Sequence, residues 1–184
     1  MNIFALSPVP EIAAKWHCDS HVIKMIVESA QMLSTAHRML DGNMDRRLSK
    51  SGKMRLRYWE LDDDREDVLY KAVHTGHPCT VWTMESHSNY KWHYQLFKYL
   101  CKEYTLRYGK IHATETKLLD LLKDPPQNIK KSYMTPFALA MGASPECMDY
   151  DDRIGSYQKF YQTKQDRFKM KWSKREIPHW FKLK

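Results

Sequence analysis

The sequence predicts a mainly α-helical fold, a single domain over residues 1–184 built as a compact bundle of about four to five helices. Two observations predict this class. Long stretches without Gly or Pro carry apolar residues at helical spacings of three and four, and alternating strand patterns are scarce. A chain of 184 residues is the size of one domain with a substantial core.

The composition excludes a disordered chain, because 42% of the residues are hydrophobic and six Trp and eleven Tyr are present. No apolar run approaches the ~20 residues that span a bilayer. The first ten residues lack the basic leader of a secretion signal. The four Cys are widely separated without a C-x-x-C motif, which indicates free thiols in a reducing compartment. We therefore expect a cytoplasmic protein.

The net charge of +8, from 30 Lys and Arg against 22 Asp and Glu, favours a polyanionic partner. Nucleic acid is the first expectation, because basic proteins of this size attract phosphate backbones electrostatically.

Residues 1–6 are apolar, and they form either a short buried strand or a segment that pins the N-terminus. Ser7–Pro10 is an extended entry, since each Pro disfavours helix in its predecessor. Residues 11–38 then predict one helix of about seven turns, which ends near Asp41–Asn43. Its predicted buried stripe is Ile12, Trp16, Ile23, Ile26, Val27, Ala30 and Leu33.

A second, polar stripe follows the same helix in steps of four and three, so its side chains are predicted to point the same way. It consists of His17, His21, Lys24, Glu28, Gln31 and Thr35. Imidazoles, an amine and a carboxylate in register are typical of proton transfer or metal binding. The alternative is an ordinary Lys24–Glu28 ion pair beside surface or capping histidines.

Residues 43–66 predict a charged loop inserted into the bundle. Its basic residues are Arg46, Arg47, Lys50, Lys53, Arg55 and Arg57, and Asp62–Asp64 follow them. With Tyr58 and Trp59 beside it, the basic half is a candidate arm for phosphates. The alternative is a solvated loop whose two halves neutralise each other. Residues 68–73 are expected to add a short helix.

Residues 79–108 predict a second long, aromatic helix that stops at Gly109, with Glu85, Asn89 and His93 on its polar stripe. A third helix is predicted at 115–122, capped by Thr114 and stopped by Pro125 and Pro126. After a loop over residues 130–142, a last helix is expected from the capping cluster at 149–152 to about Trp172. Its basic outer face is Lys159, Lys164, Arg167, Lys169 and Lys171. The aromatic C-terminal residues 174–181 are expected to dock on the body.

Several motifs resemble those of a family of uncharacterised proteins from tailed phages and some bacteria. The matching pieces are H-C-D-x-H-V-x-K-M-x-x-E-x-x-Q-x-L-x-T-A-H-R (17–38), H-P-x-x-V-W-x-x-E-S-x-x-N-Y-x-W (77–92), E-Y-T-x-R-Y-G-K-x-H (103–112), T-P-F-A-x-A-M (135–141) and W-x-x-R-E-I-P-x-W (172–180). They cover nearly the whole chain outside 43–66. The resemblance implies a phage-type protein of the host cytoplasm.

The order of segments also resembles, more distantly, the phage-type pyrimidine-dimer DNA glycosylase/AP lyase family, also called endonuclease V. That resemblance implies a small helical fold whose terminal α-amine is the nucleophile, near a helix carboxylate. This chain departs from the family at two points. Met1 precedes Asn2, a residue that disfavours removal of the methionine, and the family's carboxylate position falls on Lys24, with Glu28 one turn further.

The first functional hypothesis is a DNA-acting enzyme that excises or alters a base. Glu28 would act as general acid/base or stabilise an oxocarbenium ion, and Lys24 or the α-amine would form an imine, with His17 and His21 moving protons. The phosphate-binding candidates are Arg38, Arg107 and Lys110. The further substrate-binding candidates are His77, Trp82, Glu85, Asn89, His112 and Thr135.

Two alternatives remain at this stage, and neither the first hypothesis nor the second alternative requires a cofactor. A metal-dependent nuclease or hydrolase would bind a divalent metal through His17 and His21, one helical turn apart. Candidates to complete its ligand shell are Asp19, Glu28, His37 and His112. The second alternative is a non-catalytic phage protein that binds nucleic acid or a host protein.

Overall fold

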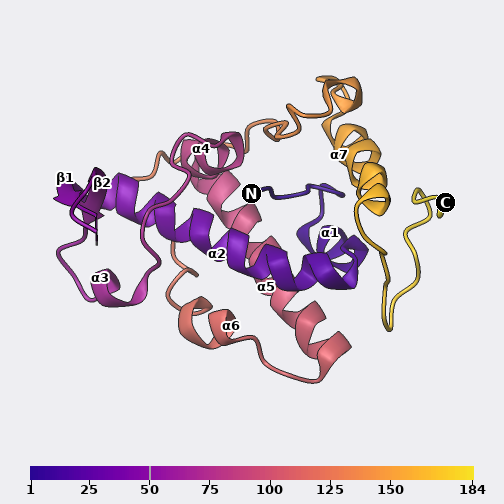
Figure 1. Ribbon diagram of the computed structural model, residues 1–184, viewed down its shortest axis with the longest axis horizontal. Helices are drawn as coiled ribbons and strands as arrows, with labels where there is room; N and C mark the ends of the chain where they lie inside the picture. Colours follow the sequence, from indigo (N-terminus) through magenta and orange to yellow (C-terminus); the bar gives the residue numbers. More distant parts are fainter. Residues whose placement is uncertain (50) are drawn as a thin grey trace.

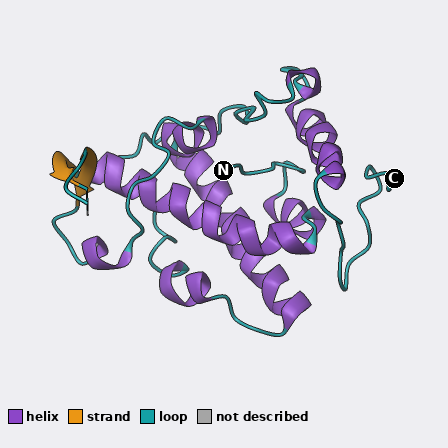
Figure 2. Cartoon of the chain, viewed as in Figure 1, coloured by secondary structure: helices purple, strands orange, loops and turns teal. Residues whose placement is uncertain are grey.

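The computed structural model describes residues 1–49 and 51–184. The helices are α1 (Pro10–Trp16), α2 (Asp19–Asp41), α3 (Arg65–Val68), α4 (Pro78–Glu85), α5 (His87–Tyr108), α6 (Ala113–Leu118) and α7 (Arg153–Gln162), and the strands are β1 (Asn43–Leu48) and β2 (Arg55–Glu60). Two short 3₁₀ helices, η1 (Pro145–Cys147) and η2 (Thr163–Asp166), complete the described elements. The predicted mainly helical class is confirmed, although the described residues form more helices than expected (Figure 2).

The first predicted long helix is broken between α1 and α2. His17 and Cys18 both adopt extended backbone, with ψ of 136° and 163°. No Gly or Pro forces this break. Distant side chains satisfy the backbone groups that it releases: Arg107 donates to the carbonyl of His17 over 2.7 Å, and Cys18 N–H donates to the Tyr161 hydroxyl over 2.9 Å.

The second predicted long helix is also two helices. Ser86 is extended, and its hydroxyl accepts from the Asn89 N–H, which caps the start of α5. The C-terminal end of α5 agrees with the prediction, because Gly109 adopts a left-handed φ of 67°.

Helix α5 passes behind α2, and α1 and α2 both pack on it, with α4 against the far part of the pair (Figure 1). Of the predicted apolar stripe, Ile26, Ala30 and Leu33 lie in this core at 0% exposure, and Trp16 and Val27 are partly buried. Ile12 and Ile23 are exceptions, since both are exposed. None of the helices described in residues 1–49 and 51–184 is long and apolar enough to cross a membrane.

The predicted charged loop at 43–66 is wrong in its secondary structure. Strands β1 and β2 form an antiparallel hairpin in which Arg46 pairs with Arg57. Gly42 permits the tight exit from α2, because an added Cβ would lie 2.6 Å from the Arg38 carbonyl oxygen. Helix α3 lies at 65–68, and residues 69–73 do not form the expected helix.

Other boundaries also differ. Residues 1–6 form no strand. Helix α6 ends at Leu118 and is capped by His112, whose ring accepts from the Thr114 N–H. Helix α7 ends at Gln162, well before Trp172. The predicted docking of the C-terminal residues 174–181 is confirmed, since Arg175 pairs with Glu103 of α5 over 2.7 Å and the Trp180 ring lies 5.8 Å from the Trp16 ring.

Candidate functional site

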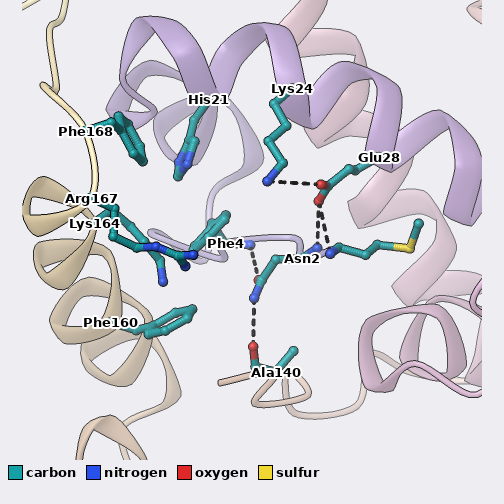
Figure 3. Close-up of a pocket in the computed structure, with 11 residues that line it drawn as sticks. Asn2, Phe4, His21, Lys24, Glu28, Ala140, Phe160, Lys164, Arg167 and Phe168 are labelled. Carbon is teal, nitrogen blue, oxygen red and sulfur yellow. Dashed lines mark hydrogen bonds and ion pairs between the residues drawn. The ribbon is translucent and has the colours of Figure 1, made fainter. Parts of the chain in front are cut away.

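A cavity of about 440 Å³ lies where the N-terminal segment crosses between α2 and the C-terminal end of α7 (Figure 3). The N-terminal segment contributes Met1, Asn2 and Phe4, and α2 contributes His21, Lys24 and Glu28. The opposite wall consists of Ala140, Phe160, Lys164, Arg167 and Phe168. The volume is within the usual range for small-molecule sites.

Asn2 fixes the N-terminal segment at this cavity through three hydrogen bonds. Its backbone N–H donates to Glu28 Oε2 over 2.8 Å, and its side-chain amide donates to the Ala140 carbonyl over 2.8 Å. Its Oδ1 accepts from the Phe4 N–H over 2.9 Å. These bonds hold Phe4 at a φ of 40°, which is strained for a bulky residue.

Glu28 is the carboxylate at the centre of the site. Its Oε2 lies 3.8 Å from the α-amine of Met1, and its Oε1 lies 3.5 Å from Lys24 Nζ. Figure 3 shows Asn2 and Lys24 approaching this carboxylate from different sides. Because a carboxylate can accept a proton from either amine, the arrangement has the components of an acid–base pair.

His21 lines the cavity but is only 5% exposed. Its ring is stacked 5.0 Å from Phe4 and lies 5.1 Å from Tyr161. Burial, followed by the charges of His17, Lys24 and Lys164, lowers the pKa of His21 to about 3. The imidazole is therefore neutral at pH 7. Its buried Nδ1 has no hydrogen-bond partner among the described residues.

Two cations on the opposite wall were missed as site residues. Lys164 is 9% exposed, and its Nζ lies 3.4 Å from the centroid of the Phe160 ring. Burial and then the neighbouring Arg167 lower the pKa of Lys164. The sequence placed both on the basic outer face of the last helix. It gave no signal that this face meets the N-terminus.

His17 does not join the polar stripe in the cavity. The break before α2 leaves it at the end of α1, where it is fully buried and its Nδ1 lies 2.7 Å from the Ala13 carbonyl oxygen. Burial lowers the pKa of His17 to about 4. Thr35 is also buried, and its hydroxyl contacts the Val73 backbone. His21, Lys24 and Glu28 remain together.

The two arginines predicted to bind phosphate face the interior. Arg38 is 1% exposed and donates to four backbone carbonyls and to the Glu66 carboxylate. Arg107 is 6% exposed and binds Glu103, Asp19 and two carbonyls of the α1–α2 junction. We assign structural roles to both, because their donors are already occupied. Lys110 is exposed but lies beyond the end of α5.

The other predicted substrate contacts are dispersed. Glu85, Asn89 and Thr135 do meet, since the Thr135 hydroxyl donates to Glu85 and Asn89 Oδ1 accepts from the Thr135 N–H. Together with the Trp82 indole, which donates to the Thr135 carbonyl, they tie a loop to α4 and α5 away from the cavity. His77 and His112 cap helices.

His77 lies near the N-terminal amine. Burial, followed by the positive charge of the N-terminal amine, lowers the pKa of His77. It is not among the residues that line the cavity.

The metal alternative finds no ligand set in the described part of the chain. There, no group of three or more His, Cys, Asp and Glu side chains is placed to hold an ion. His17 and His21, the predicted pair, are separated by the break between α1 and α2 and are both surrounded by aromatic rings.

Comparisons of the chain with protein-family models, with curated proteins and with solved structures found no match. The chemistry of the cavity therefore carries the functional argument.

Proposed function

We propose that the protein is a DNA-acting enzyme, a base-excision glycosylase/lyase of the phage type. The observation that carries the proposal is the convergence of the Met1 α-amine and the Asn2 N–H on Glu28, inside a cavity with cationic and aromatic walls. A chain terminus normally lies free in solvent. Here its position is fixed to within a few ångströms of a carboxylate.

In the proposed reaction, the nitrogen lone pair of the Met1 α-amine attacks C1′ of a damaged nucleotide. The bond from C1′ to the base breaks, its electron pair leaves with the base, and the amine nitrogen gives up a proton to Glu28. Protonated Glu28 returns this proton to the ring oxygen as the bond from the ring oxygen to C1′ breaks, which gives an imine protonated on nitrogen. Glu28, again a carboxylate, takes a proton from C2′, and the 3′ phosphate leaves by elimination. Water then hydrolyses the imine, which returns the Met1 amine and releases the sugar.

The same cavity has groups suited to an extruded nucleotide. Chemistry at C1′ requires the nucleotide to leave the stack, and aromatic side chains then replace the lost stacking. Phe4, Phe160 and Phe168 supply such rings, and Lys24, Lys164 and Arg167 supply positive charge for phosphate. Glu28 is the one carboxylate among the described lining residues, so the site favours an anionic substrate.

Borohydride trapping on duplex DNA with an abasic site tests the proposal. Reduction should give a covalent adduct on the wild-type protein, and peptide mapping should place it on Met1. A variant with one extra residue inserted after Met1 should give no adduct, because the amine is displaced from Glu28. Mapping to Lys24 or Lys164 would reject the α-amine as nucleophile, and no adduct on abasic or ultraviolet-damaged DNA would reject the proposal.

A non-catalytic binder of nucleic acid is the second candidate. It is supported by the 3.5 Å Lys24–Glu28 pair and by the burial of His17 and His21, which are compatible with purely structural roles. This candidate predicts that Glu28→Gln and His21→Ala preserve DNA affinity and that no adduct forms.

A further inference from the structure

The β1–β2 hairpin projects from the end of α2 that is remote from the N-terminus (Figure 1). Because side chains alternate between the faces of a strand, the register divides its residues into two faces. The arginine face consists of Met44, Arg46, Leu48, Arg55, Arg57 and Trp59. The paired face consists of Asn43, Asp45, Arg47, Leu56, Tyr58 and Glu60.

Charge neutralisation in the hairpin is confined to the paired face. Arg47 forms a 2.5 Å ion pair with Glu60, lies 3.7 Å from the Asp45 carboxylate, and stacks 4.1 Å from the Tyr58 ring centroid. The positive charge of Arg47 is therefore neutralised by carboxylates of the hairpin itself.

The arginine face has no such compensation. Arg46, Arg55 and Arg57 are exposed, and none of them forms an ion pair with a described carboxylate. Arg46 and Arg57 are directly opposite each other across the ladder, where like charges destabilise a sheet. The two guanidinium groups repel each other in the free protein. A polyanion that lies between them would be attracted to both, so the same arrangement would favour its binding.

The remaining residues of this face fit a nucleic-acid groove. Met44 and Leu48 are 55% and 66% exposed, and they flank Arg46 on the same strand. Trp59 is buried at the base of the hairpin, where its carbonyl accepts from Arg38 over 3.0 Å and Arg57 lies 5.6 Å from its ring. The major groove of DNA admits a two-stranded ribbon, where arginines bind phosphates or guanine and apolar side chains contact thymine methyls.

We infer that the arginine face of the hairpin binds duplex DNA, as a second contact separate from the cavity. Thirteen helical residues from Glu28 to Asp41 of α2 place the hairpin about 20 Å from the site. At 3.4 Å per base pair this is about six pairs. The relevance of this spacing rests on the proposed function, because it is counted from the proposed catalytic site. The inference that the hairpin binds duplex DNA does not depend on that function.

The test measures the salt dependence of binding to an undamaged duplex by fluorescence anisotropy. The variant is Arg46→Ala with Arg57→Ala. The matched control is Arg47→Ala with Lys71→Ala, which removes the same charge from cations that both lie over the Tyr58 ring. Losing two phosphate contacts should make the slope of log K against log salt shallower by roughly 2. The affinity of the variant should therefore fall roughly tenfold less than that of the wild type when salt rises from 50 to 200 mM.

The control should keep the wild-type slope, and Arg46→Lys with Arg57→Lys should restore it. The melting temperature of the alanine variant should not fall, because a repulsive pair has been removed. Equal slopes for the variant and control, no binding of the wild type to duplex, or retention of the arginine dependence only on anionic lipid vesicles would each overturn the inference.

Borohydride trapping separates this inference from the proposed function. Trapping on an abasic duplex that extends ten pairs on both sides should weaken in the hairpin variant, whereas trapping on a stem that ends three pairs from the abasic site should not. If the alanine variant changes the salt slope but the wild type forms no adduct, the hairpin contact stands and the proposed enzyme is rejected. If the wild type forms an adduct but the variant does not change the salt slope, the proposed enzyme stands and the hairpin contact is rejected.

Discussion

The backbone N–H of Asn2 donates to Oε2 of Glu28 over 2.8 Å, although 26 residues separate them in the chain. This bond is one of the contacts that hold the N-terminus in the cavity. It makes Glu28 both a structural anchor and the proposed acid–base group, and the two roles can be separated by experiment.

Glu28→Gln keeps an acceptor for the Asn2 N–H but removes the negative charge. We expect the rate of borohydride trapping to fall about 100-fold or more, and the free energy of unfolding to fall by about 1–3 kcal/mol. Lys24→Met is the control for the stability change alone, because its side chain is 60% exposed and its ion pair with Glu28 contributes little to the free energy of unfolding. An unchanged trapping rate in Glu28→Gln would contradict the acid–base role.

Phe4→Ala should destabilise the protein and open the cavity. Phe4 is 5% exposed and is packed against His21, Phe160 and Tyr161. Removing such a ring costs about 3–5 kcal/mol, which lowers the melting temperature by about 10 °C. Thermal denaturation followed by circular dichroism measures this. A shift of about 2 °C or less would mean that the N-terminal segment is not part of the core.

Acid should destabilise the protein because its histidines are buried in the neutral form. Burial lowers the pKa of His21 to about 3, from 6.5 in the unfolded chain. The unfolded state therefore binds more protons between these values, so stability is complete above pH 6.5 and is lost as pH falls toward 3.

His21→Phe tests the contribution of this one residue. The loss of unfolding free energy between pH 7.5 and 5.0 should be smaller by about 2 kcal/mol in the variant than in the wild type. Urea titration at both pH values measures the difference. Equal losses would show that His21 titrates normally in the folded protein.

Arg107→Lys should be strongly destabilising. The Arg107 side chain is fully buried. It pairs with Glu103 within α5 and connects α5 to the break between α1 and α2 through Asp19 and two carbonyls. The single amine of a lysine cannot make the several hydrogen bonds of the planar guanidinium. We therefore expect the free energy of unfolding, measured by urea titration, to fall by about 3 kcal/mol. Arg175→Lys is the control, since Arg175 shares Glu103 but is 32% exposed. Similar losses in both would refute the bridging role.

The sequence by itself determined the helical class, part of the apolar face of α2, the Gly109 stop and the register of His21, Lys24 and Glu28. Each follows from local periodicity or from one residue's backbone preference, which neighbouring positions along the chain reveal. The hairpin escaped prediction because its stability depends on cross-strand pairs and on the anchoring of Trp59, not on an alternating apolar pattern.

The tertiary structure decided which of these groups form a site. It broke the first helix at His17, because Arg107 and Tyr161 bind the freed backbone there, and so it removed one histidine from the stripe. It also brought Met1 and Lys164, which are far apart in the sequence, to opposite walls of one cavity. Contacts between residues so distant in sequence depend on the packing of the whole domain, which no local pattern encodes.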